Sequence, residues 1–306
     1  MSRNYLKRVV EVADLDDPRI GAYRNLKERT LRGESIFIAE GSLVVERLLA
    51  SSFQVESLLI TQKEGLDKPL SLVPEDVPIY YLEERLAVNR LVGFDFSRGI
   101  LAVGKRKELP TMLEGFANYF SGDKNREPDP SGKWPIRKRR AWVMLPDATK
   151  PDNLGLAFRC GAALDAEAII LGEQCCDPFS RRALRVSMGG VLQTPIYQAK
   201  NLKEEIAECR KRWGIPFYAT ILDDRAISAY DFASSSLVKR HEAVFVFGNE
   251  YSGLDAEMVS LCDESVKIPM RGDVDSLNLG VSVDSTGVFS VSTGEVSAFV
   301  SVDGVC

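Results

Sequence analysis

The sequence predicts an α/β protein with a mostly parallel sheet in its C-terminal part and a small α/β sandwich in its N-terminal part. In the C-terminal half, short apolar runs alternate with helical patterns, which is typical of strands joined by crossover helices. The 306 residues suffice for two units of ordinary size, and a polar stretch rich in turn formers, Ser121 to Gly132, separates them. We therefore expect an N-terminal domain over 1–110, a linker or loop over 111–140, and a second domain over 141–306.

The N-terminal part contains one clear helix and several strands. Apolar residues recur at helical spacing from Ser42 to Ala50. Short apolar runs predict strands at Ile36–Ala39, Val55–Ile60, Ile79–Leu82 and Ile100–Gly104. These elements predict the small sandwich.

The C-terminal part repeats a unit of strand, polar or glycine-rich turn and helix. The predicted strands are Ala141–Leu145, Ala168–Leu171, Phe217–Leu222, Ala243–Phe247 and Val266–Ile268, and the predicted helices are Asn153–Leu164 and Leu202–Trp213. In such sheets the ligand lies outside the carboxyl ends of the strands. Residues that directly follow these strands are therefore the candidates for a site.

The net charge of −5 does not exclude a nucleic-acid partner. Five of the 44 acids, and no Lys or Arg, lie in Gly272–Cys306, so residues 1–271 carry 39 acidic and 39 basic side chains. Basic residues concentrate at Arg137–Arg140, at Lys105–Lys107 and around Arg181. Each concentration is either a phosphate contact or an ordinary solvated face.

Composition also predicts the compartment and the absence of a metal. No apolar run approaches a membrane span, and the acidic N-terminal segment fits no targeting peptide, so we expect a cytoplasmic protein. The six cysteines form no C-x-x-C pair, and His241 is the single histidine. We expect reduced thiols and no metal site.

The first candidate segment runs from Pro151 to Arg159. Pro151 fixes the entry to the helix, and Asp152 or Asn153 is expected to cap it. Arg159 sits among small apolar residues, where a buried guanidinium is costly unless it is paired. We expect it to face solvent or a carboxylate in a cleft.

Two further segments follow later strands. Gly248 and Gly253 allow a tight turn, and Glu250 between them is a natural partner for Arg159. The third segment begins with Ile268-Pro269-Met270 and continues to Ser276-Leu277-Asn278. The chain lacks G-x-G-x-x-G and P-loop spacings, which disfavours a nucleotide-dependent oxidoreductase.

In order and spacing, these three segments resemble the signature motifs of the SpoU (TrmH-type) RNA methyltransferases of the SPOUT superfamily. The stretch Phe37-Ile38-Ala39-Glu40-Gly41 is similar to the N-terminal RNA-binding domain of the family's two-domain members. The resemblance implies an S-adenosylmethionine-dependent enzyme that methylates a ribose 2′-hydroxyl in tRNA or rRNA. It also implies a homodimer, and a catalytic domain that ends in a deep trefoil knot, an exception to the rule against threaded chains.

The resemblance assigns roles to individual positions. The positions that match cofactor contacts are Gly248, Ile268 and Leu277. The positions that match polar groups around the reacting hydroxyl are Asn153, Arg159, Glu250, Ser276 and Asn278. A guanidinium close to a ribose hydroxyl would stabilise the alkoxide that develops there, with no metal required.

The chain departs from the family after position 279. The family continues with an Ala-rich helix that closes the knot, whereas Leu279 to Ser290 contains repeated Ser, β-branched residues and Gly287, which lower helix propensity. A catalytically weakened RNA-binding or assembly protein of the same fold therefore stays open as the alternative function.

Overall fold

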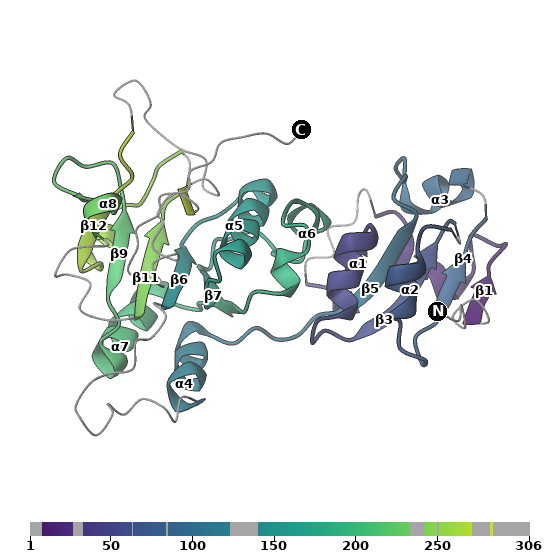
Figure 1. The fold of residues 1–306 in the computed structure, drawn as a ribbon, viewed down its shortest axis with the longest axis horizontal. Coiled ribbons are helices and arrows are strands. Elements are labelled where there is room, and N and C mark those ends of the chain that lie inside the picture. The colour runs from purple at the N-terminus through teal and green to yellow at the C-terminus, as the bar shows by residue number, and fades with distance from the viewer. Residues whose placement is uncertain are drawn as a thin grey trace.

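The computed structural model describes residues 8–26, 33–62, 64–83, 85–122, 140–232, 242–249, 251–270 and 282–283. The described chain forms two sheets, one in each half of the sequence, with α5 and α6 of the second half and α1 of the first half between them (Figure 1). In these residues no helix has the length and hydropathy needed to cross a membrane.

The N-terminal sheet has five strands in the order β1-β4-β3-β5-β2, with β5 antiparallel to both of its neighbours. Its elements are β1 (Val9–Glu11), η2 (Pro18–Tyr23), β2 (Ile36–Glu40), α1 (Ser42–Leu49), β3 (Val55–Ile60), α2 (Asp67–Ser71), β4 (Ile79–Tyr81), α3 (Arg85–Val92) and β5 (Ile100–Lys105). The four predicted strands and the predicted helix are confirmed. The elements β1, α2 and α3 were not predicted from the sequence.

Both faces of this sheet are covered because its strands are apolar on both sides. Phe37 packs in one core cluster with residues of α1 and α2, whereas its neighbour Ile38 packs in a second cluster with residues of η2 and α3. Successive side chains of a strand point to opposite faces, so one apolar run serves two cores. The result is a layered α/β arrangement.

The C-terminal sheet has seven strands, all parallel, in the order β10-β12-β9-β11-β6-β7-β8. Its elements are β6 (Arg140–Leu145), α5 (Pro151–Ala163), β7 (Ala168–Leu171), α6 (Arg181–Val186), η3 (Gly190–Leu192), β8 (Ile196–Gln198), α7 (Leu202–Trp213), β9 (Phe217–Thr220), β10 (Ile227–Ser228), α8 (Ala229–Phe232), β11 (Glu242–Phe247), α9 (Ala256–Ser260) and β12 (Glu264–Lys267). The prediction of a mostly parallel sheet is confirmed. The strands β8 and β10 and the short helices α6, α8 and α9 were not predicted from the sequence.

The segment 111–140, expected to be a linker or loop, begins with a helix, α4 (Met112–Gly122). Met112 and Phe116, four residues apart on one helix face, are fully buried against the C-terminal sheet. The Phe116 ring lies 5.0 Å from that of Trp142 on β6. The apolar residues of this helix therefore pack on the sheet, although the residues that follow in the sequence are polar. Residues 123–139 lie outside the described chain.

The start of α5 also differs from the prediction. The helix begins at Pro151, and the residue at its N-cap is Lys150, whose side chain makes no capping bond. Asp152 instead pairs with Arg182 of α6 at 2.7 Å, and Asn153 is buried in the first turn. Proline is suited to the first helical position because its missing N–H would have no helical partner there.

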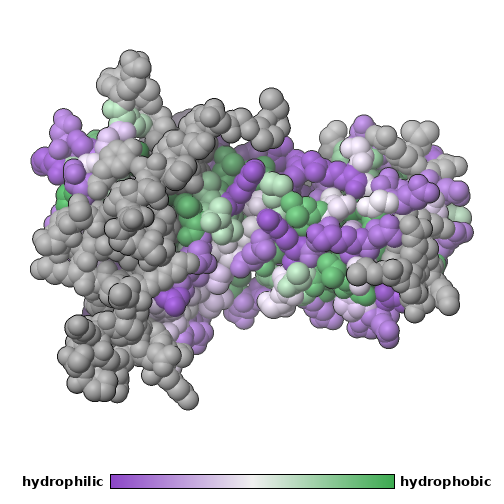
Figure 2. Space-filling view, in the orientation of Figure 1, coloured by the Kyte–Doolittle hydropathy of each residue, from purple (hydrophilic) through white to green (hydrophobic). Residues whose placement is uncertain are grey.

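One hydrophobic cluster continues from the first sheet into the second. Phe37 of β2 stacks on Phe179, which follows β7, with ring centroids 5.2 Å apart. In the middle of the face in Figure 2, hydrophobic residues gather over α5, and hydrophobic and hydrophilic residues are mixed further to the right. The two sheets therefore share packed apolar contacts.

Removing the Phe116 side chain tests whether α4 belongs to the C-terminal core. We expect Phe116→Ala to lower the free energy of unfolding by about 3–5 kcal/mol, because it leaves a cavity against Trp142. Urea unfolding measures this change. Asn118→Ala on the exposed face of α4 is the control, expected within about 0.5 kcal/mol of wild type. A Phe116→Ala protein as stable as wild type would contradict the packing of α4.

Candidate functional site

The loops after β6 and β11 meet at the carboxyl edge of the C-terminal sheet. β11 pairs with β6 on one side and with β9 on the other, all in parallel. The strands β6, β7 and β8 run outward in one direction, and β11 lies on the opposite side of β6. The order of the strands thus reverses between β6 and β11, the place where ligands bind in open parallel sheets.

A hydrogen bond joins these two loops. The Asn249 amide nitrogen, just after β11, donates to Oδ2 of Asp147, just after β6, at 2.9 Å. The amide oxygen of Asn249 accepts from the backbone N–H groups of Tyr251 at 2.9 Å and Ser252 at 2.8 Å. One side chain therefore shapes its own turn and holds the neighbouring loop.

The turn after β11 closes tightly on itself. Asn249 and Gly253 form an antiparallel bridge, and the Gly253 N–H donates to the Asn249 carbonyl at 3.0 Å. A Cβ atom at Gly248 would lie 2.2 Å from the carbonyl carbon of Gly253. Only glycine fits at Gly248, and the tight turn agrees with the turn expected from the sequence.

A second contact between the loops is cationic. The Lys150 ammonium group donates to the Tyr251 hydroxyl at 2.6 Å and lies 4.2 Å from the centre of the Tyr251 ring. Tyr251 is 81% exposed, so this contact forms the outer rim of the site. The two loops are thus tied at a deeper and at an outer point.

Buried Cys175 supports the β6 loop from behind. Its thiol donates to the Leu145 carbonyl at 3.0 Å and accepts from the Ala148 N–H at 3.3 Å. Burial raises the pKa of this thiol to about 11, so it stays protonated and able to donate at neutral pH. Cys175 is therefore a structural clamp on the loop that carries Asp147.

The residues predicted for the site fall into two groups. Among the described ones, Gly248 lies at the joined loops, Ile268 directly follows β12, and Asn153 is buried in the first turn of α5. Arg159 lies on the same helix, six residues or about 9 Å further along its axis. Four predicted residues lie outside the described chain: Glu250, Ser276, Leu277 and Asn278.

The Arg159 side chain is exposed, which agrees with the expectation that its guanidinium is not buried without a partner. Its backbone passes under η3, where a Cβ at Gly190 would lie 3.0 Å from the Phe158 carbonyl oxygen and 3.5 Å from the Arg159 nitrogen. The close crossing fixes this part of α5. Three residues of the site were not predicted from the sequence: Asp147, Asn249 and Cys175. Asp147 and Asn249 each follow a predicted strand closely, which is the signal that could have identified them.

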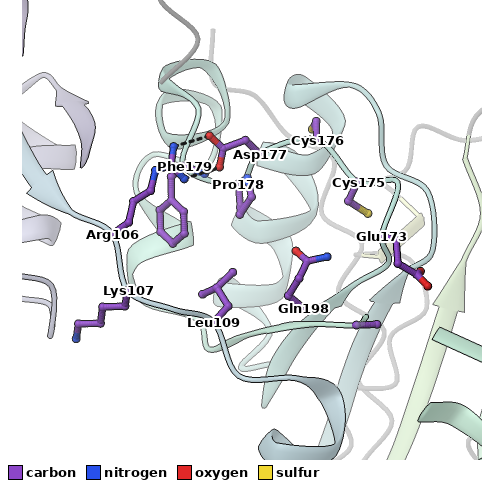
Figure 3. A pocket seen from close by; sticks show the side chains of 11 residues that line it. Arg106, Lys107, Leu109, Glu173, Cys175, Cys176, Asp177, Pro178, Phe179 and Gln198 are labelled. Atoms are coloured by element: carbon purple, nitrogen blue, oxygen red, sulfur yellow. Dashed lines mark hydrogen bonds and ion pairs between the residues drawn. The ribbon is translucent and has the colours of Figure 1, made fainter. Parts of the chain in front are cut away.

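A cavity of about 410 Å³ lies beside the β6 loop, between Cys175, Gln198 and the connection around Arg106 (Figure 3). Its polar groups already have internal partners. Arg106 pairs with Asp177 through two bonds of 2.8 and 2.6 Å, and Gln198 donates to the Gly172 carbonyl at 3.0 Å. The cavity is therefore a hollow at the junction of the sheets, and the described residues offer no cluster that would hold a metal ion.

Comparison with known proteins identifies the second half of the chain. The model of the SpoU rRNA Methylase family matches residues 140–285. An uncharacterized tRNA/rRNA methyltransferase of Mycobacterium bovis is 30% identical over 279 residues, which cover 90% of this chain and 88% of the relative. The 23S rRNA (guanosine-2′-O-)-methyltransferase RlmB of Acinetobacter baylyi is 31% identical over 206 residues, 65% of this chain and 72% of the relative.

Solved structures share the fold. A putative RNA methyltransferase of the TrmH family from Porphyromonas gingivalis has a TM-score of 0.69 at 24% identity, covering 91% of this chain and 98% of the other. The AdoMet-bound rRNA methyltransferase from Sinorhizobium meliloti has a TM-score of 0.68 at 23% identity, covering 92% and 97%. The fold similarity therefore extends over both sheets.

Gly248→Ala tests the tight turn after β11. We expect it to lower the free energy of unfolding by about 1–3 kcal/mol or more, because the new Cβ meets backbone that cannot move aside. The shift of the urea midpoint measures it. Gly253→Asn is the matched control, since Gly253 has open space around it and asparagine tolerates its φ of +65°. Equal effects of the two substitutions would contradict this account.

Cys175→Ala tests the clamp on the β6 loop. The Ala148 N–H loses its acceptor and stays buried, so we expect a loss of about 1–3 kcal/mol in unfolding free energy. Cys175→Ser, whose hydroxyl can both donate and accept, is expected to lose less. The prediction fails if the serine and alanine proteins unfold at the same urea concentration.

Proposed function

Because the chain belongs to the SpoU rRNA Methylase family, we propose that it transfers the methyl group of S-adenosylmethionine to a ribose 2′-hydroxyl of RNA. The observation that carries the proposal is the joining of the β6 and β11 loops by Asp147 and Asn249 at the reversal point of the sheet. RlmB of Acinetobacter baylyi, which is named a 23S rRNA 2′-O-methyltransferase, supports the reaction type. The substrate is structured RNA, tRNA or rRNA, and the compartment is the cytoplasm.

The described residues at the sheet edge fit the cofactor. The Oδ1 atom of Asp147 is buried and makes no hydrogen bond to the described residues, so a donor on a bound molecule would satisfy it. The backbone turn at Gly248 and the partly buried Ile268 would hold the cofactor, together with Leu277, which lies outside the described chain. S-adenosylmethionine supplies an electrophilic methyl group.

Arg159 is the proposed catalytic cation. A ribose hydroxyl is a weak nucleophile, and a guanidinium stabilises the negative charge that develops on its oxygen. Arginine stays protonated in proteins, so it acts by charge and hydrogen bonding and does not take the proton. We assign Asn153, Ser276 and Asn278 to orienting the ribose or its phosphate, and Glu250 to holding Arg159.

We also propose that the C-terminal end of the chain forms the family's deep trefoil knot. Val283 is fully buried and belongs to the same core cluster as Ala141, Val143 and Leu145 of β6. A residue that follows Asn278 therefore packs in the hydrophobic core to which β6 belongs. The family match also continues past Asn278 to residue 285, which supports a complete catalytic fold over the alternative of a catalytically weakened assembly protein.

The proposed assembly is a homodimer with α5 in its interface. Leu156 and Cys160 of α5 are only partly buried, and hydrophobic residues gather over this helix in Figure 2. We propose residues 1–110 as the RNA-binding domain and 141–306 as the methyltransferase domain, with α4 packed on the latter.

Arg159→Ala tests the catalytic role. We expect the rate of methyl transfer to fall by about 10²–10³-fold, because the developing alkoxide loses its stabilising charge, while S-adenosylmethionine binding is largely spared. Transfer of labelled methyl to total ribosomal RNA and calorimetry with the cofactor measure the two effects. Arg212→Ala on α7, also an exposed arginine, is the control. Full activity of Arg159→Ala would overturn the role, and undetectable cofactor binding by wild type would favour the assembly protein.

A further inference from the structure

Three arginines from both halves of the chain surround one buried carboxylate. Glu40, the last residue of β2, is only 5% exposed. Among the described residues, three guanidinium groups form ion pairs with its carboxylate, with nitrogen–oxygen distances of 3.0 Å for Arg181, 3.6 Å for Arg185 and 3.5 Å for Arg98. Arg98 lies in the connection just before β5 of the N-terminal half, whereas the other two lie on α6 of the C-terminal half. We call these four residues the Glu40 cluster.

Arg181 neutralises the Glu40 carboxylate and donates a hydrogen bond to it. It also donates to the Leu26 carbonyl at 2.9 Å, and its guanidinium lies 4.1 Å from the centre of the Phe94 ring. With 16% of its side chain exposed, it is the structural link between α6 and the N-terminal sheet. A buried carboxylate needs one such partner to offset its desolvation.

Arg98 and Arg185 add positive charge beyond the single cation needed to neutralise Glu40. Their side chains are 53% and 30% exposed, and their contacts to Glu40 are longer than an ordinary hydrogen bond. Each guanidinium carries five N–H donors, of which such a contact uses at most one. Three positive charges around one negative charge leave a surplus of two at this point of the surface.

The backbone is arranged to admit Arg98. Gly41 has a φ of +90°, and a Cβ there would lie 3.2 Å from Cδ of Arg98. Glycine therefore lets the Arg98 side chain cross the chain directly beside Glu40. The Glu40-Gly41 pair thus builds a charged site as well as a turn into α1.

The cluster is continuous with the candidate site along α6. One helical turn before Arg185, Arg182 donates a hydrogen bond to Asp152 in the first turn of α5. Lys150 directly precedes that turn. In Figure 1, α6 lies between α5 and α1. Cations therefore extend from the β6 loop, across α6, to the N-terminal sheet.

We propose that Arg98 and Arg185 form a binding site for a backbone phosphate of the RNA substrate, anchored by Glu40 and spanning both sheets. This inference rests on the proposed function. Arginine forks match phosphate oxygens, and a phosphate between the two guanidinium groups would neutralise the surplus charge. RNA bound there would contact both sheets at once and reach the methyl-transfer site along α6.

Salt dependence of RNA binding tests this site. The variants are Arg98→Gln, Arg185→Gln and the double substitution, with Arg212→Gln as matched control, because Arg212 is 54% exposed and pairs with Glu208 on α7. Fluorescence anisotropy with a 30-nucleotide RNA stem–loop is measured between 50 and 200 mM salt. We expect each single variant to weaken binding and to lower the slope of log K against log salt by about 1. Arg212→Gln is expected to keep the wild-type slope.

The same proteins separate this inference from its rivals. A purely structural cluster predicts lower urea midpoints with an unchanged salt slope, and that result would overturn the phosphate site. An unchanged slope and unchanged stability would overturn it equally. Failure of the proposed function is read separately, as a wild-type protein that neither binds S-adenosylmethionine in calorimetry nor methylates ribosomal RNA.

Discussion

The pairing of β11 between β6 and β9 is the constraint on which the site depends. Because all three strands are parallel, this pairing brings the residues after β6 beside those after β11, although about a hundred residues separate them in sequence. The Asp147–Asn249 bond and the Lys150–Tyr251 contact are consequences of this register. A shift of one residue would turn every β11 side chain to the other face and separate the loops. The geometry of the site is therefore set by the sheet and only refined by its loops.

The segment between β7 and η3 connects the site with the N-terminal sheet. Near its start, Cys175 holds the β6 loop, and two residues later Asp177 receives the Arg106 guanidinium from the end of the N-terminal half. Further along, Arg181 reaches Glu40. One continuous segment thus fixes both the loop of the proposed methyl-transfer site and the orientation of the sheet proposed to bind RNA.

The sequence predicted what depends on local pattern and missed what depends on tertiary contact. The apolar runs located the main strands, and the position of Gly248 after a buried strand identified a turn. The structure adds that no Cβ atom fits there. Short helices such as α6 escaped because six residues carry too little periodicity. Helix α4 escaped because its polar continuation obscured the apolar face at Phe116. Cys175 is a site residue only through the fold, since nothing in its neighbourhood marks a thiol that clamps a distant loop.

Net charge is a poor guide to this protein's partner because the placement of its charges matters more than their sum. The chain totals −5, yet five of its acids lie in the last 35 residues, and the Glu40 cluster sets three arginines around one carboxylate. Electrostatic attraction between exposed charges fades beyond about 8–10 Å at physiological salt, so distant acids do not cancel a local surplus. The cations also divide their tasks by position. We propose Arg185 on α6 and Arg98 for binding RNA through its phosphates, and Arg159 on α5 for stabilising charge at a single oxygen. If the proposed roles hold, substitutions at Arg98 and Arg185 would change RNA affinity, whereas a substitution at Arg159 would change the rate of methyl transfer.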